Sequence, residues 1–197
     1  MAINRYYPAF LDLNDRYCVV VGGGTVAERK VVKLLASGAR VSVVSPELTK
    51  QLALLKNDKK IKHISRKYRS IDIEDAFVVV AATNSGVLNE RIAKDSSDKL
   101  VNVADRPELS SFIVPSVISR SPLLIAVSTS GVSPAMAMTI RRELERLYPP
   151  SVGRYLRRLS LLRKEAIRQI NDPKERAKFL RSLAGQDVLD ILRKKKG

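Results

Sequence analysis

An apolar run that ends in three glycines is the feature that most constrains how this chain can fold. Residues 16–21, RYCVVV, are apolar and β-branched, which predicts a buried strand. Residues 25–37, TVAERKVVKLLAS, carry apolar residues near the helical period, which predicts a helix that ends at Gly38. A strand, a glycine turn and a helix in this order predict the opening of an α/β domain.

The same alternation continues to about residue 112. Parallel strands joined by helices of about three turns are typical of a Rossmann-type, doubly wound parallel sheet. Further strands are expected at 39–45, 60–65, 75–83 and 100–105, with helices at 47–56 and 85–98. The predicted fold class is therefore α/β.

The pattern changes after Asp105. Residues 110–131 hold two apolar, β-branched runs joined at SRSP, which predicts an antiparallel hairpin. A helix is expected at 133–148, with Ser133 as N-cap and Pro134 at its first position. A small hairpin with one helix buries little apolar surface alone, so it should pack on another surface, such as its copy in a dimer.

Three parts follow from this organisation. They are a dinucleotide-binding Rossmann domain at 1–112, a hairpin-plus-helix dimerisation segment at 113–150 and a basic helical C-terminal domain at 151–197. Pro149 and Pro150 end the helix of the second part. Breaks at Asn171–Pro173 and Gly185 divide the helical third part.

Positive charge is concentrated toward the C-terminus. The chain has a formal net charge of +16, and residues 151–197 hold 14 Lys and Arg against 5 Asp and Glu. Residues 1–150 hold 22 against 15. Such a tail predicts an anionic partner, either nucleic acid, a membrane surface or a polyanionic small molecule. The alternative is a solvated basic helix face.

Several classes of protein are disfavoured by composition. No apolar run approaches the roughly 18–20 residues of a membrane span, and the N-terminus lacks the pattern of a signal peptide. Cys18 is the single cysteine and His63 the single histidine, so neither a disulfide framework nor a preformed metal site is expected. The expected location is the cytoplasm, without a membrane partner.

The glycine loop has the spacing of a dinucleotide site. Gly22, Gly24 and Ala27 fit the pattern G-x-G-x-x-[G/A], between a predicted strand and a predicted helix. The first glycine allows the tight turn, the second lets the backbone approach a pyrophosphate, and the free N–H groups of the helix N-terminus bind the phosphates. The alternative is a glycine turn that only closes a strand-to-helix corner.

Residues at the ends of the next strands fit the same cofactor. Ser45 stands where an acidic ribose ligand is expected and Glu47 lies two residues beyond, with no arginine directly after. NAD is therefore favoured over NADP, although Glu47 also suits the first turn of a helix. After the fourth strand, small residues leave room for the nicotinamide-side ribose, or form a simple turn into the next helix; they are Ala82, Thr83 and Asn84.

Asp105 follows the fifth strand at the same edge of the sheet. A carboxylate there is a candidate base that accepts a proton while NAD⁺ accepts a hydride. The alternative reading is an aspartate that forms the turn before Arg106 and Pro107.

At these residues the sequence resembles a known family. The stretches VVVGGGTVAERK, VVAATN, VNVADRPELSSFIVPSVISRSPLLIAVSTSGVSPAMA and RRELERLYP are similar, in order from about Pro8 to Pro149, to the precorrin-2 dehydrogenase and siroheme synthase dehydrogenase–ferrochelatase family. A generic Rossmann protein would share the glycines but not the hairpin sequence. The C-terminal tail resembles the family only in being helical.

The resemblance implies a fold, a reaction and a set of residues. The fold is an NAD-binding Rossmann domain, a dimerisation segment and a helical domain in an intertwined homodimer. The reaction is NAD⁺-dependent oxidation of precorrin-2 to sirohydrochlorin, on the way to siroheme or related tetrapyrroles. Asp105 matches the proposed catalytic aspartate, Thr25, Val26, Pro46 and Glu47 match cofactor contacts, and Thr129 stands where some relatives have a phosphorylated serine.

The charge agrees with the implied substrate, because precorrin-2 is a polycarboxylate. Arg154, Arg157 and Arg158 are predicted to face it, and another polypeptide, a methyltransferase, is expected to supply it. Fe²⁺ chelation by the same chain stays open. Rival hypotheses are a dinucleotide-sensing regulatory module and a nucleic-acid binder, although no nucleic-acid-binding motif is evident.

Overall fold

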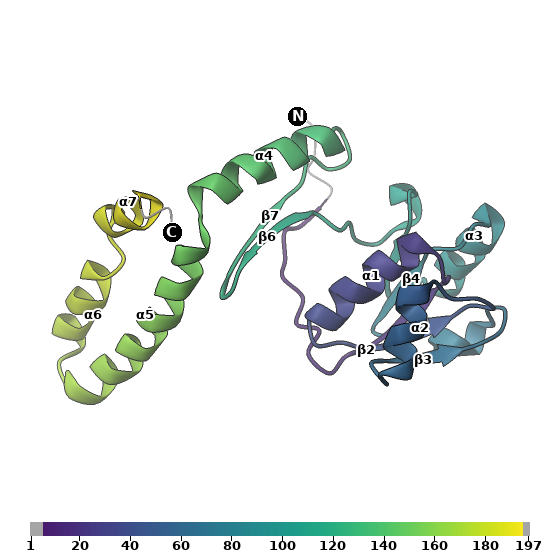
Figure 1. Ribbon diagram of the computed structural model, residues 1–197, viewed down its shortest axis with the longest axis horizontal. Helices are drawn as coiled ribbons and strands as arrows, with labels where there is room; N and C mark the ends of the chain where they lie inside the picture. The colour runs from purple at the N-terminus through teal and green to yellow at the C-terminus, as the bar shows by residue number, and fades with distance from the viewer. Residues whose placement is uncertain (1–5, 195–197) are drawn as a thin grey trace. The chain divides into compact units, whose positions relative to one another are not determined.

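A computed structural model describes residues 6–194 and divides the chain into two compact units, with the boundary between Val114 and Pro115 (Figure 1). The first boundary expected from sequence, at residue 112, lies two residues earlier. The further division at residue 150 stays a prediction.

The first unit is built on a five-stranded parallel sheet with the order β3-β2-β1-β4-β5. Its strands are β1 (Tyr17–Val21), β2 (Arg40–Val44), β3 (Ile61–Ile64), β4 (Val78–Ala81) and β5 (Leu100–Val103). Its helices are α1 (Thr25–Ala36), α2 (Lys50–Asn57) and α3 (Gly86–Asp95), with the short 3₁₀ helices η1 (Ser70–Ile73) and η2 (Pro107–Leu109). This arrangement confirms the predicted Rossmann-type fold.

Both faces of the sheet are buried, because successive side chains of a strand point to opposite sides. On one face Val20 and Val43 pack with Val31 of α1 and Leu52 of α2. On the other face the buried residues include Val19, Val79 and Val101, together with Ile73 of η1 and Ile92 of α3. Each fully buried Val, Leu or Ile side chain contributes on the order of 1.5–3 kcal/mol.

Cys18 belongs to the first of these two layers and is fully buried. Burial raises the pKa of its thiol to about 11. Because the thiolate is the reactive form, Cys18 acts as a small core residue.

Helix α2 begins three residues later than the sequence predicted. Thr49 is its N-cap and accepts a hydrogen bond from the Leu52 N–H at 3.2 Å. The Thr49 N–H in turn donates to the Gly23 carbonyl at 3.0 Å. Glu47 therefore lies in the loop before the helix and not in its first turn.

Up to Lys194, the second unit contains a hairpin and four helices. The antiparallel strands β6 (Ser116–Arg120) and β7 (Leu123–Val127) confirm the predicted hairpin. Ser133 caps α4 (Pro134–Leu147), as predicted, by accepting the Met136 N–H at 3.2 Å. The remaining helices are α5 (Pro150–Gln169), α6 (Pro173–Ser182) and α7 (Gln186–Lys194). Among the described residues, no helix is both long and apolar enough to cross a membrane.

Helix α5 packs tightly against the hairpin turn. A Cβ atom at Gly153 would overlap the carbonyl oxygen of Arg120, so only glycine fits there. The Arg120 Nε donates to the Tyr148 carbonyl at 3.1 Å, and the Arg157 guanidinium donates to the Ser121 carbonyl at 2.6 Å. These contacts fix the start of α5 on the turn between β6 and β7.

Candidate functional site

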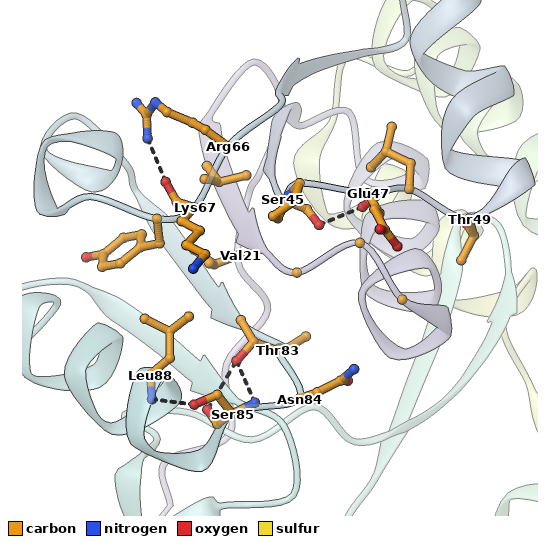
Figure 2. A pocket seen from close by; sticks show the side chains of 18 of the residues that line it. Val21, Ser45, Glu47, Thr49, Arg66, Lys67, Thr83, Asn84, Ser85 and Leu88 are labelled. Carbon is orange, nitrogen blue, oxygen red and sulfur yellow. Dashed lines mark hydrogen bonds between the residues drawn. The ribbon is translucent and has the colours of Figure 1, made fainter.

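A cavity of about 840 Å³ opens at the carboxyl ends of the strands of the first unit (Figure 2). This is the edge where parallel α/β sheets bind ligands, and the volume lies within the range of small-molecule sites. Eight of the predicted cofactor residues line it: Gly22, Gly24, Ser45, Pro46, Glu47, Ala82, Thr83 and Asn84. Thr25 and Val26, the first residues of α1, do not belong to its lining.

The three glycines of the loop differ in what surrounds them. Gly22 has a φ of +122°, and a Cβ there would overlap the Ala82 carbonyl oxygen. A Cβ on Gly23 would overlap the Glu47 carbonyl oxygen. At Gly24 no atom lies within 4 Å of the Cβ position, so its backbone faces open space at the N-terminus of α1. That space fits a pyrophosphate, which needs close approach of the backbone and free N–H groups.

The loop after β2 is held in place by polar contacts. Ser45 is buried, and its hydroxyl donates to the Glu47 carbonyl at 2.6 Å. His63, on β3, lies 2.8 Å through its Nε2 from the Ser45 carbonyl. This contact ties β3 to the loop after β2, and His63 does not belong to the cavity lining. Glu47 itself is exposed at the rim, where a carboxylate can accept hydrogen bonds from ribose hydroxyls.

The loop after β4 is fixed by a buried amide. Asn89 of α3 is 8% exposed; its Oδ1 accepts from the Thr83 hydroxyl at 2.7 Å, and its Nδ2 donates to the Thr83 carbonyl at 3.2 Å. Ser85 caps α3 by accepting the Leu88 N–H at 3.3 Å (Figure 2). Thr83 and Asn84 thus belong to a rigid turn that also lines the cavity.

The loop after β3 adds cavity residues that sequence reasoning missed: Arg66, Lys67 and Tyr68, with Arg91 from α3. The Arg66 guanidinium donates two hydrogen bonds, of 2.6 and 2.8 Å, to the Asp72 carboxylate. The Tyr68 hydroxyl donates to Asp95 at 3.0 Å, and burial, with that bond, raises the pKa of Tyr68. The predicted strand at 60–65 could have pointed to these residues, because its carboxyl end lies beside the carboxyl end of β2, where the cavity opens.

The Asp72 carboxylate is almost completely buried, with 2% of its side chain exposed. Burial alone would raise its pKa, but hydrogen bonds from Arg66 and from the Arg69 N–H outweigh this and hold the pKa below its usual range. The pair therefore shapes the cavity wall and neutralises the Arg66 charge.

Asp105 lies outside the lining of the cavity, one strand further along the same edge. Its backbone is left-handed, with a φ of +59°, and its side chain is exposed. The preceding Ala104 N–H donates to the Ala81 carbonyl at 2.9 Å, which anchors the turn beside β4. The following Arg106 pairs with Glu90 and Glu108, so its charge is satisfied.

The predicted substrate arginines belong to the second unit. Arg154, Arg157 and Arg158 are exposed on α5, and Arg157 also holds the Ser121 carbonyl. The hydroxyl of Thr129, the position that the sequence resemblance linked to phosphorylation, forms hydrogen bonds within the loop before α4. It donates to the Ser133 carbonyl at 2.9 Å and accepts the Ser133 N–H at 3.0 Å.

Family models match both units. A model described as "Putative NAD(P)-binding" matches residues 9–116, and one described as "Sirohaem biosynthesis protein central" matches residues 120–147. The first agrees with the cavity and its glycine loop and indicates a nicotinamide dinucleotide as the cofactor.

Curated relatives and a solved structure extend this similarity. The chain is 39% identical over 188 residues to a siroheme synthase of Thioalkalivibrio sulfidiphilus, covering 94% of this chain and 38% of that protein. It is 43% identical over 149 residues to a siroheme synthase of Methylobacillus flagellatus, covering 75% and 32%. The chain thus spans less than two fifths of these relatives. The structure of SirC, a precorrin-2 dehydrogenase, matches with a TM-score of 0.84, 27% identity and 96% coverage of both chains.

Proposed function

This chain belongs to the precorrin-2 dehydrogenase and siroheme synthase dehydrogenase–ferrochelatase family, and from that premise we propose that it oxidises precorrin-2 to sirohydrochlorin with NAD⁺. The observation that carries the proposal is the match to SirC over 96% of both chains, including the unit that follows the Rossmann fold. A generic dinucleotide-binding protein would account for the first unit alone.

The first unit supplies the groups for binding the cofactor. The N–H groups at the start of α1 and the open backbone of Gly24 would hold the pyrophosphate, and Glu47 would accept the ribose hydroxyls. NAD is favoured over NADP on two grounds. The Glu47 carboxylate would repel a 2′-phosphate, and the Arg66 guanidinium is already occupied by Asp72. When bound, NAD⁺ supplies a hydride acceptor.

Asp105 is the proposed base. Its exposed carboxylate stands at the end of β5, next to the strand that leads into Ala82 and Thr83. Loss of a hydride from precorrin-2 must be matched by loss of a proton, and a carboxylate at this place would take up that proton. Arg106 does not compete for Asp105, because Glu90 and Glu108 hold its guanidinium.

The second unit would contribute electrostatic attraction and dimer contacts. Arg154, Arg157 and Arg158 are proposed to bind substrate carboxylates, and replacing all three should raise KM far more than it lowers kcat. An unchanged KM would reject this role. Exposed apolar side chains of the hairpin, the loop after it and α4 are proposed to pack in a homodimer; they are Val117, Leu124, Val132, Met136, Met138 and Ile140. Sedimentation of a wild-type monomer at micromolar concentration would reject the dimer.

The test of the function is anaerobic absorbance at the NADH band, with precorrin-2, NAD⁺ and wild type beside Asp105→Asn. Asparagine is the right replacement because it tolerates the left-handed backbone, which alanine does not. Asp15→Asn is a matched control, because Asp15 also has a positive φ, of +57°, and precedes the central strand β1 at its amino end, away from the cavity. We expect the rate of NADH formation to fall on the order of 100-fold or more in Asp105→Asn and to stay unchanged in the control.

Other outcomes separate the alternatives. If wild type and Asp105→Asn formed NADH at the same rate, the proposed dehydrogenase activity would stand, but Asp105 would have only a structural role in its turn. No NADH from wild type, although NAD⁺ binds, would point to a chelatase or a dinucleotide-sensing module instead.

A further inference from the structure

One face of α1 gathers positive charge that the protein itself leaves unpaired. Arg29 and Lys33 are four residues apart and exposed, and Lys30 is half-buried beside them. Within residues 6–194, none of the three forms an ion pair with a carboxylate. Like charges at this spacing destabilise a helix by a few tenths of a kcal/mol per pair. A bound anion would remove that cost.

Lys30 is the member of this cluster that is held in place. Its ammonium donates to the Asn102 Oδ1 at 2.7 Å, across from α1 to β5. Asn102 is 6% exposed and is fixed in turn by donating from Nδ2 to the Phe112 carbonyl at 3.2 Å. An ammonium has three N–H donors, so further donors remain for a ligand.

The ammonium also lies within electrostatic range of the proposed base. Burial lowers the pKa of Lys30, the charges of Lys33 and Arg29 lower it further, and Asp105 acts in the opposite direction. Asn102 and Asp105 belong to the same strand end, three residues apart. The cluster therefore adjoins the place where the proton would be removed. By contrast, Arg106 is neutralised by Glu90 and Glu108.

We propose that Arg29, Lys30 and Lys33 form a carboxylate subsite that binds acid side chains of the tetrapyrrole and brings the macrocycle to Asp105. The identity of the ligand as a tetrapyrrole rests on the proposed function; the preference for a polycarboxylate rests on the cluster itself. Lys30 makes the direct hydrogen bond, because Asn102 orients it. Arg29 and Lys33 are exposed and supply longer-range attraction, which salt screens.

The test measures binding of uroporphyrin, an octacarboxylic porphyrin, to the full chain by absorbance at low ionic strength. Lys30→Gln keeps a hydrogen-bond donor for Asn102 but removes the charge, Lys30→Arg keeps the charge, and Lys56→Gln removes an exposed charge from α2. We expect Lys30→Gln to raise the Kd about tenfold, Lys30→Arg to restore most of the affinity and Lys56→Gln to leave it unchanged. Circular dichroism of all variants checks that they fold.

The outcomes separate this subsite from the proposed reaction. Equal Kd values for wild type and Lys30→Gln, or no binding by wild type, would overturn the subsite even if wild type forms NADH from precorrin-2. A tenfold loss in Lys30→Gln, with no NADH from wild type, would keep the subsite and reject the oxidation. An equal loss in Lys30→Arg and Lys30→Gln would also count against it, since packing and not charge would then be the cause.

Discussion

At the scale of single residues, Gly22 and Gly24 have different roles: Gly22 is required for folding, and Gly24 is expected to be required for binding the cofactor. A methyl group at Gly22 would overlap the Ala82 carbonyl on a left-handed backbone, so Gly22→Ala should lower the free energy of unfolding by several kcal/mol. Gly24 has an ordinary φ of −83° and open space at its Cβ position, so Gly24→Ala should cost no more than about 1 kcal/mol, the penalty for alanine at a helix N-cap. Its methyl group would instead stand where a pyrophosphate approaches, and we expect about tenfold weaker NAD⁺ binding by calorimetry. Wild-type affinity in Gly24→Ala would place the dinucleotide elsewhere.

A second residue-scale prediction concerns pH. The folded pKa of Asp72 is lowered below its unfolded value, near 3.9. Its stabilisation is therefore fully present above about pH 4 and is lost as the pH falls through the folded pKa. Asp72→Asn should cost about 2 kcal/mol at neutral pH in urea unfolding, and the difference from wild type should shrink below about pH 4. Asp98 is an exposed carboxylate that pairs with Lys99, so Asp98→Asn should change the free energy of unfolding little at any pH. If the difference between Asp72→Asn and wild type stayed constant down to strongly acidic pH, Asp72 would not be the group responsible.

At the scale of elements, the sequence predicted each strand of the sheet. Four of them are valine-containing apolar runs, as is typical of buried parallel strands, and β3 is a shorter run with isoleucine at both ends. It also predicted the cavity loops that follow β1, β2 and β4. It missed the loop after β3, because nothing local in Arg66 and Lys67 signals a ligand. Arg66 and Lys67 line the cavity because the strand order places β3 beside β2. Arg66 is held there by its hydrogen bond to Asp72 in the following 3₁₀ helix. Both are non-local consequences of the fold.

The contact between α5 and the hairpin supplies an element-scale prediction. Gly153 lies against the backbone of Arg120, which cannot move without shifting the hairpin, so Gly153→Ala should separate the two elements. We expect a loss of about 2 kcal/mol or more in hydrogen-exchange protection of β6 and β7. Gly185→Ala is the matched control: its Cβ would meet only the Asp187 carboxylate, which can rotate away. Equal protection in both variants would contradict the close approach.

At the scale of the whole molecule, charge is divided unequally between the two units. Residues 115–197 hold 18 Lys and Arg against 7 Asp and Glu, whereas residues 1–114 hold 18 against 13. A polycarboxylate substrate carries many negative charges, so the positive field of the second unit should attract it strongly. NAD⁺ carries few charges and is bound mainly by backbone N–H groups. Raising KCl from roughly 50 to 300 mM should therefore raise the KM for precorrin-2 steeply and the Kd for NAD⁺ only slightly.

The same salt series tests where that field originates. Replacing Arg154, Arg157 and Arg158 with Gln removes three of the second unit's charges and should flatten the dependence of KM on salt, while the NAD⁺ series stays as in wild type. Sucrose at equal osmolarity controls for effects of the solute other than screening. Parallel slopes for substrate and cofactor in wild type would mean that the basic helices do not act on the substrate. Their charge would then be a solvated surface, and recognition would rest on the first unit alone.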